Sequence, residues 1–321
     1  MKRLLFGLIC SLALMSCGSG DANVSEDVPV KRIALTFDDA PTGDTVLLTG
    51  EDRTQRLMMS LQAVEVDQVA FFVTTRGLEA DGGVARIEAY ADAGHIIANH
   101  SHAHLWAIRT SVEDYLVDVD LAQQWLDKID IPAASRRAWF RFPFLDEGTP
   151  LDKRDALRAG LAERGLKNGY VTVDNYDWHI NNLWRRAVRD GRSVDLDILQ
   201  TAYIDILMSA IEFYDAAAVK HLGISPPHVL LLHENDTSAM FIDDLVLALR
   251  AKGWEIISPD QAYEGAFAQT VPQTLRTRQG HLAALAIEAG AEPRSFDHLA
   301  INEDQIEAFL EERGAFGATA K

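Results

Sequence analysis

Short apolar runs alternate with longer stretches of helical periodicity from Lys31 onward. This alternation predicts strand–helix–strand units around a parallel sheet, and therefore an α/β fold. Runs such as 69–73 and 229–232 are apolar at every position, which is typical of strands covered on both faces. We expect seven strands, at about 32–37, 68–73, 95–98, 138–142, 169–173, 228–233 and 254–258.

Boundary residues predict where the helices between these strands begin and end. Ser111 followed by Asp114 is typical of a helix start. Thr149-Pro150 predicts the cap and first turn of a second helix, which ends at Gly165. Helical periodicity predicts two further helices, at about 194–219, after a polar lead-in, and at 242–252.

The N-terminal end of the chain departs from this pattern. Residues 1–17 contain two basic residues, an apolar stretch too short to span a bilayer comfortably and a small residue before Cys17, as in a secretory signal. Leu14-Met15-Ser16-Cys17 also resembles the bacterial lipoprotein processing box, so we expect lipidation of Cys17; an ordinary cleaved signal is the alternative. Residues 18–30 are small and polar, as a tether between a lipid anchor and a folded domain would be.

Composition and charge narrow the class of protein. Apolar residues make up 48% of the chain, which excludes a disordered protein. Removal of residues 1–17 would take away two basic and no acidic residues, and the net charge would move from -18 to -20. So acidic a body is repelled by nucleic acid, which we exclude as a partner. Only Cys17 would remain after processing, so no internal disulfide is expected and the core has to stabilise the fold.

Polar residues follow the carboxyl ends of five predicted strands. Ligands of parallel α/β folds bind at that edge of the sheet, so we expect these residues to meet in one site. The clusters lie at 36–41, 100–104, 141–144, 174–178 and 233–235.

Two of these clusters have the composition of a metal site. His100 and His104 are four positions apart and, on one helical turn, would have Cβ atoms about 5–6 Å apart. With one of the adjacent carboxylates Asp38 and Asp39 they make two imidazoles and a carboxylate, which leaves open positions for water and substrate. A histidine-rich surface loop, and a turn or cap at the aspartate pair, are the alternatives. His102 would lie on the opposite side of that turn, outside the site.

Together the clusters resemble the polysaccharide deacetylases, the NodB-like carbohydrate esterases of family four. The five motifs occur in the expected order: Thr36-Phe37-Asp38-Asp39-Ala40-Pro41, His100-Ser101-x-x-His104, Arg141-x-Pro143-Phe144, Asp174-x-x-Asp177-Trp178 and Leu230-x-x-His233. The resemblance covers about 31–263 and implies that family's distorted (β/α) barrel of about seven parallel strands. We expect the Ala-rich remainder, 264–321, to be a helical C-terminal extension.

The resemblance implies roles for the residues of the first three motifs. Asp39, His100 and His104 would bind one divalent metal ion, most simply zinc, with cobalt, nickel or iron(II) as alternatives. Asp38 would be the catalytic base that takes a proton from the attacking water. Arg141 would hold this base through a charge-assisted pair, which an arginine can make bidentate.

The later motifs would complete the reaction centre. His233 would be the general acid, oriented by Asp177, and would protonate the leaving amine or alkoxide. The backbone N–H of Phe144 would help to hold the oxyanion, and Trp178 would wall the acetyl pocket. No covalent intermediate is required, and the chain has no G-x-S-x-G elbow.

Three positions depart from the family pattern. Ala40 replaces the usual Gly, Leu105 the usual Pro and Phe144 the usual Tyr. None of these changes removes a reacting group, so they affect substrate preference more than activity. Arg185-Arg186, beside Trp184, either border a substrate groove or are structural.

The implied function is a metal-dependent hydrolase that removes N- or O-linked acetyl groups from a cell-envelope or environmental polysaccharide. The leader implies export and a lipid anchor on the cell envelope, facing the periplasm, with the outer membrane slightly preferred. Hydrolysis of a small non-sugar amide or imide on the same fold is one alternative. A lipid-anchored protein that binds glycan without cleaving it is the other.

Overall fold

The computed structural model of the protein describes residues 30–275 and 278–319. The predicted signal, Cys17 and nearly all of the predicted tether lie outside the described residues. Within the described part of the chain, no helix is long and apolar enough to cross a membrane.

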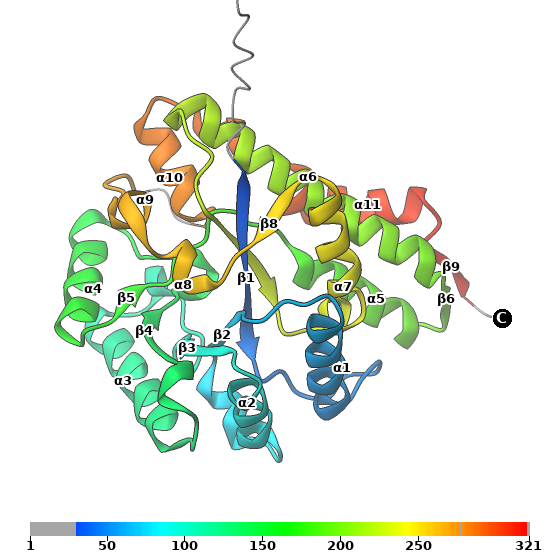
Figure 1. Cartoon of the computed structure of the whole chain (residues 1–321), viewed down its shortest axis with the longest axis horizontal. Helices are drawn as coiled ribbons and strands as arrows, with labels where there is room; N and C mark the ends of the chain where they lie inside the picture. The colour runs from blue at the N-terminus through cyan, green and yellow to red at the C-terminus, as the bar shows by residue number, and fades with distance from the viewer. Residues whose placement is uncertain (1–29, 276–277, 320–321) are drawn as a thin grey trace, which may run out of the picture.

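A parallel sheet forms the centre of the molecule. Its order is β5-β4-β3-β2-β1-β7, and β8 pairs with the first residues of β1, which runs through the middle of the fold (Figure 1). Six residues in a row are buried in β1, as expected for a strand covered on both faces. The strands are β1 (Lys31–Ala40), β2 (Ala70–Val73), β3 (Ile96–Asn99), β4 (Arg136–Phe140), β5 (Lys167–Asn168), β7 (His228–His233) and β8 (Trp254–Ile256).

The strand expected at 169–173 does not form. Instead β5 is two residues long and pairs with β4, and the chain then crosses to β7, where Val173 makes an isolated bridge with Leu230. A Cβ on Gly169 would lie 2.4 Å from a ring atom of Phe72, so this crossing needs glycine. Because the segment touches both β4 and β7, it closes the sheet into the distorted (β/α) barrel that the sequence predicts.

Helices surround the barrel. Ser111 accepts a hydrogen bond from the Asp114 N–H at 3.0 Å, which confirms the predicted helix start. Pro150, not Thr149, is the N-cap residue of α4, and it makes no side-chain cap bond. These helices are α1 (Gly50–Ala63), α2 (Gly83–Asp92), α3 (Val112–Lys128), α4 (Leu151–Glu163), α5 (Asp177–Arg189), α6 (Leu196–Leu222) and α7 (Asp236–Ala251).

The expected polar lead-in before residue 194 is in fact helix α5. Its buried face includes Ile180, Leu183, Trp184 and Ala187, while asparagine and arginine residues occupy the positions between them. The helix is therefore strongly amphipathic, and its many polar residues hide the apolar stripe in the sequence. Helix α7 also begins at Asp236, six residues earlier than predicted, because Asn235 caps it through the Ser238 N–H.

Short elements complete the barrel and continue the chain beyond it. Strand β9 pairs antiparallel with β6, so the C-terminal region is not purely helical. Helices α10 and α11 pack against α6, and α11 also packs against α5. These elements are β6 (Arg192–Val194), α8 (Pro259–Ala262), α9 (Gly265–Gln269), α10 (Gly280–Glu288), α11 (Glu303–Glu312), β9 (Phe316–Thr319) and the 3-10 turns η1 (Thr75–Glu79), η2 (Ala107–Arg109), η3 (Ala133–Ser135), η4 (Pro143–Leu145), η5 (Pro293–Phe296) and η6 (Leu299–Ile301).

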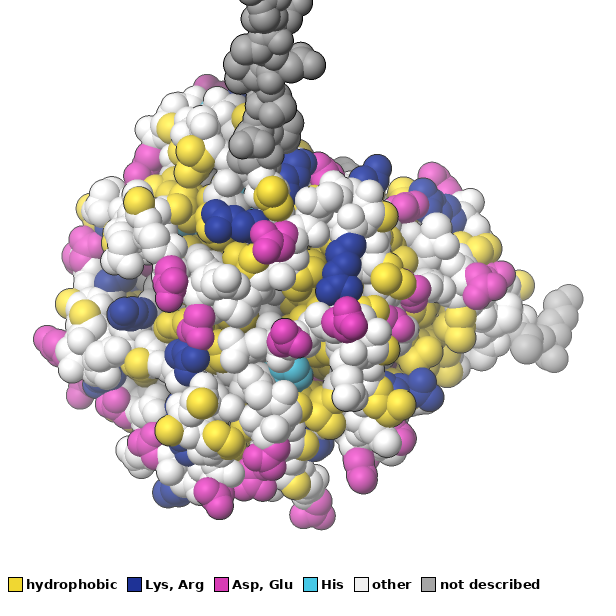
Figure 2. Space-filling view, in the orientation of Figure 1, with side chains coloured by type: hydrophobic (Ala, Val, Ile, Leu, Met, Phe, Trp, Pro, Cys, Tyr) yellow, Lys and Arg dark blue, Asp and Glu magenta, His cyan; other side chains and the backbone are white. Residues whose placement is uncertain are grey.

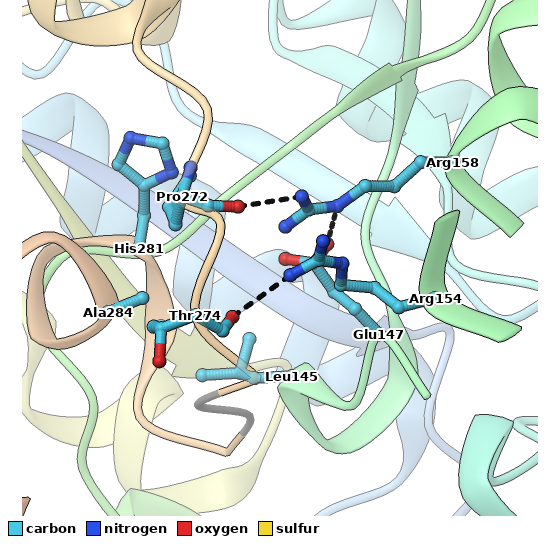
Figure 3. Close-up of a pocket in the computed structure, with 9 residues that line it drawn as sticks. Leu145, Glu147, Arg154, Arg158, Pro272, Thr274, His281 and Ala284 are labelled. Atoms are coloured by element: carbon cyan, nitrogen blue, oxygen red, sulfur yellow. Dashed lines mark hydrogen bonds and ion pairs between the residues drawn. The ribbon is translucent and has the colours of Figure 1, made fainter. Parts of the chain in front are cut away.

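Two arginines of α4 bind residues 272–274, which follow α9. Arg154 is buried and donates to the carbonyl oxygens of Gln273 and Thr274, at 2.5 and 3.1 Å. Arg158 donates to the carbonyl of Pro272 at 2.7 Å and pairs with a glutamate on the loop before α4 (Figure 3). The C-terminal region is therefore attached to the barrel at residues 272–274.

Candidate active site and metal centre

Asp39, His100 and His104 meet beyond the carboxyl ends of β1 and β3. One ligand atom from each lies within 4.8 Å of the others. The Asp39 Oδ1 atom is 3.3 Å from Nε2 of His104 and 3.6 Å from Nε2 of His100. The structure thus brings together the three residues that the sequence predicts as metal ligands.

The two histidines do not lie on a helical turn, as their spacing predicts. They belong to a loop in which Ser101 and His104 have left-handed φ values of 67° and 54°. Side chains shape this loop, since the Ser101 hydroxyl accepts from the His104 N–H at 3.0 Å and Asp118 of α3 accepts from two further backbone N–H groups. The imidazole centroids of His100 and His104 consequently lie 5.0 Å apart.

The side chain of His102, on the same loop, contacts η1 and not the metal cluster. Its Nδ1 is 3.0 Å from the hydroxyl of Thr75, and its Nε2 is 3.7 Å from a carboxylate oxygen of Glu79. Both partners belong to η1, so His102 lies outside the metal cluster, as expected.

The donor atoms of the cluster suit a divalent cation. Burial lowers the pKa of His100 to about 4, so this imidazole is neutral at pH 7. Its Nδ1 lies 2.9 Å from the carbonyl oxygen of Arg141, which places the proton on Nδ1 and leaves the Nε2 lone pair toward Asp39. Burial alone would raise the pKa of Asp39, but His104 and the other nearby histidines outweigh it and lower that pKa. Neutral imidazoles and a carboxylate are the forms that bind a metal ion.

Asp38 and Arg141 form a buried ion pair beside this cluster. Nη1 of Arg141 donates to Oδ1 of Asp38 at 2.6 Å, and both side chains are almost fully buried. The predicted pair forms and is monodentate, because Nε donates to the carbonyl of Gly169 and Nη2 to the hydroxyl of Tyr263. The other oxygen of Asp38 lies 3.6 Å from Nε2 of His100. The expected base is thus held next to the metal ligands.

His233 and Asp177 form a second charged pair near the ligand cluster. Nδ1 of His233 is 2.6 Å from Oδ1 of Asp177, whose other oxygen accepts from the His233 N–H and from Asn235 at 2.9 Å each. Burial by itself lowers the pKa of His233, but the charge and hydrogen bond of Asp177 outweigh it and raise the pKa to about 9. The imidazole is therefore protonated at neutral pH and can donate a proton.

A cavity of about 540 Å³ joins these groups. Trp178 lines it, as expected, and so does Phe144, whose φ of 59° is left-handed. Among the residues that the structure describes, none accepts a hydrogen bond from the Phe144 N–H. This N–H is therefore available to a ligand.

Several residues of this cavity have no predicted role. Trp106 stacks on Phe144, with ring centroids 4.1 Å apart, and forms part of the wall. Asp174 is buried, its Oδ2 has no partner and burial raises its pKa to about 8, so its carboxyl is protonated at neutral pH. The sequence includes Asp174 in a motif but contains no signal for its protonation, which depends on the surrounding fold.

Arg185, Arg278 and Glu303 also line the cavity. Arg185 lies on α5, whereas Arg278 and Glu303 come from the C-terminal region, more than a hundred residues beyond the metal ligands. Arg278 and Glu303 lie near the site only because the C-terminal region packs against the barrel. Trp184 is buried and Arg186 pairs with Glu307, so of these three adjacent residues only Arg185 faces the site.

Comparison with protein families matches residues 25–168 to the polysaccharide deacetylases. The matched region is less than half of the chain and includes the first three motifs. This result confirms the resemblance predicted from the sequence. No curated protein matches the chain.

The chain is also similar to several solved structures. Peptidoglycan deacetylase PdaC from Bacillus subtilis is 22% identical over 73% of this chain and 90% of its own, with a TM-score of 0.46. A family 4 carbohydrate esterase from Streptomyces lividans is 21% identical over 72% of this chain and 95% of its own, with a TM-score of 0.48. A CE4 family pseudoenzyme from Bacillus anthracis is 16% identical over 74% of this chain and 66% of its own, with a TM-score of 0.49.

Proposed function

We propose that the protein is a metal-dependent hydrolase that removes N- or O-linked acetyl groups from a polysaccharide, on the premise that residues 25–168 match the model of the polysaccharide deacetylase family. The observation that carries the proposal is the arrangement of three groups around one cavity. They are the ligand cluster of Asp39 with two histidines, the Asp38–Arg141 pair and the His233–Asp177 pair.

The ligand cluster suits zinc best, and cobalt, nickel or iron(II) also accept two imidazoles and one carboxylate. When bound, such an ion supplies Lewis acidity, which polarises a carbonyl and makes water more acidic. The metal ligands would be Asp39, His100 and His104. Nε2 of His100 is free for this role because its Nδ1 is engaged with the Arg141 carbonyl.

The other side chains divide the proton transfers between them. Asp38, fixed by Arg141, accepts a proton from the attacking water. The Phe144 N–H donates to the oxyanion that forms from the acetyl carbonyl, a contact that is often worth about 2.7–4 kcal/mol. His233, kept protonated by Asp177, donates a proton to the leaving amine or alkoxide. No residue forms a covalent bond with the substrate.

Acetate release tests this proposal. Purified protein loaded in turn with zinc, cobalt, nickel or iron(II) should release acetate from at least one of acetylated xylan, chitooligosaccharides and peptidoglycan. Small non-sugar amides serve as the comparison set. Cleavage of those amides alone would assign the site to a different substrate class.

We also propose that the protein is exported and anchored to the cell envelope through Cys17. The support is the basic and apolar leader ahead of the processing box at 14–17. Fatty-acid labelling of the wild type, absent in Cys17→Ala, tests the anchor. Labelling of both proteins, or of neither, would contradict it.

A further inference from the structure

We propose that the cavity recognises a carboxylate on the substrate through Arg185 and Arg278, so the acetylated polysaccharide is an acidic one. The inference rests on the proposed function, because the carboxylate would belong to the same sugar as the acetyl group or to a neighbouring one. The inference names the class of polysaccharide, which the catalytic and metal-binding residues alone do not determine.

The first observation is that both guanidinium groups face the cavity without an acidic partner. Neither Arg185 nor Arg278 forms an ion pair with any described residue, and Nε of Arg185 is buried without a hydrogen-bond partner. A buried donor without a partner is unfavourable, so a ligand that accepts from it gains affinity. Arg186, the next residue on α5, pairs with Glu307 instead.

The second observation is that most acidic groups of the cavity are paired, neutral or assigned to the metal. Asp38 pairs with Arg141, and Glu234 pairs with Arg86 at 2.6 Å. Asp39 belongs to the ligand cluster, where a bound cation would match its charge, and Asp174 is neutral at pH 7 because burial raises its pKa to about 8. Glu303 remains unmatched, because burial lowers the pKa of its neighbour His179, but its side chain is more than half exposed to solvent.

The cavity thus holds two arginines without acidic partners within a strongly acidic protein. The whole chain has a net charge of -18, and acidic side chains are spread over the face seen in Figure 2, several of them next to Lys or Arg. What distinguishes Arg185 and Arg278 from other unpaired arginines is that both line the cavity of the reaction centre. Their positive charge would attract an anionic substrate to the site.

The third observation is that Arg278 is held in a defined place. Its backbone N–H donates to the carbonyl of Leu145 at 3.1 Å, and its φ of 74° is left-handed, a strained conformation that the surrounding contacts have to maintain. Arg154 and Arg158 bind the carbonyl groups of residues 272–274 to α4 (Figure 3). The guanidinium carbon of Arg278 lies 4.8 Å from the ring centroid of Trp106, which forms part of the cavity wall.

The chemistry of the two side chains indicates the kind of ligand. A guanidinium group is planar and always charged, and it matches a carboxylate through two parallel hydrogen bonds. Trp106 and Trp178 line the same cavity and provide apolar rings against which a sugar can lie. A sugar that bears a carboxylate and an acetyl group satisfies both features.

Matched substrates test the inference. One pair is a chitooligosaccharide and the same oligosaccharide oxidised at C6 to carboxylates; the other is acetylated polygalacturonate and its methyl ester. Within each pair the acetyl groups are the same and the members differ only at C6, where one carries a carboxylate and the other a neutral group. We expect the charged member to have a KM at least about tenfold lower, with a smaller change in kcat.

Variants then assign the effect to the two arginines. Arg185→Ala and Arg278→Ala should each raise KM for the charged substrate about tenfold, the size expected for loss of one charge-assisted hydrogen bond, and leave KM for the neutral one nearly unchanged. Arg185→Lys should recover part of this loss. Arg186→Ala removes the same charge one residue away and should change neither KM.

The outcomes separate this inference from the proposed function. Acetate release with equal KM values for charged and neutral substrates would overturn the carboxylate site while the deacetylase activity stood. Equal effects of Arg185→Ala on both substrates would also overturn it. Absence of acetate from every substrate would contradict the proposed function. Calorimetric titration of the metal-loaded protein with acetyl-free oligogalacturonate would then test the carboxylate site alone. Binding that Arg186→Ala retains and Arg278→Ala loses would support the site.

Discussion

Nδ1 of His233 lies 2.6 Å from Oδ1 of Asp177, and this contact keeps the imidazole charged in a buried setting. Burial favours the neutral ring, but the Asp177 carboxylate more than compensates and raises the pKa of His233 to about 9. An unperturbed histidine titrates at about 6.5. His233 is thus prepared as a proton donor before any substrate binds.

The titration of His233 can be measured directly. NMR titration of the metal-free protein should give a pKa near 9, and Asp177→Asn should lower it because the carboxylate charge is removed. Since folding raises this pKa, the pair contributes its full stability below about pH 6.5 and loses it as the pH rises through about 9. A pKa at or below the unperturbed value in the wild type would contradict the role of Asp177.

Metal binding should depend on His104 and not on His102. Zinc should raise the melting temperature of the wild type and of His102→Ala, because a ligand that binds only the folded state stabilises it. His104→Ala should lose most of this shift, since its Nε2 lies 3.3 Å from Asp39 within the cluster. Metal content after dialysis provides a second readout. Equal zinc binding by His104→Ala and the wild type would contradict the assignment of this cluster as the metal site.

Arg141 should be as important for stability as for chemistry. Arg141→Met leaves the buried carboxylate of Asp38 without its partner at 2.6 Å, so urea denaturation should show a loss of about 3–5 kcal/mol. The double variant Arg141→Met/Asp38→Asn should regain part of this loss, because the uncompensated charge is gone. Surface pairs behave differently, and Arg164→Met, whose partner Asp120 is 43% exposed, should lose at most about 1 kcal/mol. Similar losses for the two single variants would contradict the buried-pair interpretation.

The closing segment of the barrel should tolerate no side chain at Gly169. Gly169→Ala places a Cβ 2.4 Å from a ring atom of Phe72 and should destabilise the protein by about 1–3 kcal/mol. Gly43→Ala is the matched control, because a Cβ there has nothing within 4 Å. Equal unfolding free energies for the two variants would show that the crossing does not need glycine.

Much of this fold follows from patterns that are local in the sequence. The strands that become β2, β3 and β7 contain continuous apolar runs, and the capping pair at Ser111 marks α3 correctly. The segment at 169–173 has the same apolar appearance, yet its path depends on distant partners in β4 and β7. Helix α5 escapes prediction because polar residues outnumber the apolar ones on its surface.

The site, too, combines residues that local motifs predict with residues that only distant packing brings together. The motifs place Asp38, Asp39 and the two histidines at one edge of the sheet, and the structure brings them together. The loop conformation at His104 could not be predicted, because Asp118 of α3 helps to set it from outside the motif. Arg278 carries no local signal, since only the docking of the C-terminal region brings it to the cavity.

Acetate release by the zinc-loaded protein, compared with zinc-loaded Asp38→Asn, tests the central claim most directly. The substitution keeps the shape of the side chain but removes the proton acceptor, so we expect a fall in kcat of about 10²–10⁴-fold with zinc still bound. Metal analysis of both proteins is the control. Wild-type activity in Asp38→Asn, or no acetate from any acetylated polysaccharide with the zinc-loaded wild type, would contradict the assignment of this site to deacetylation.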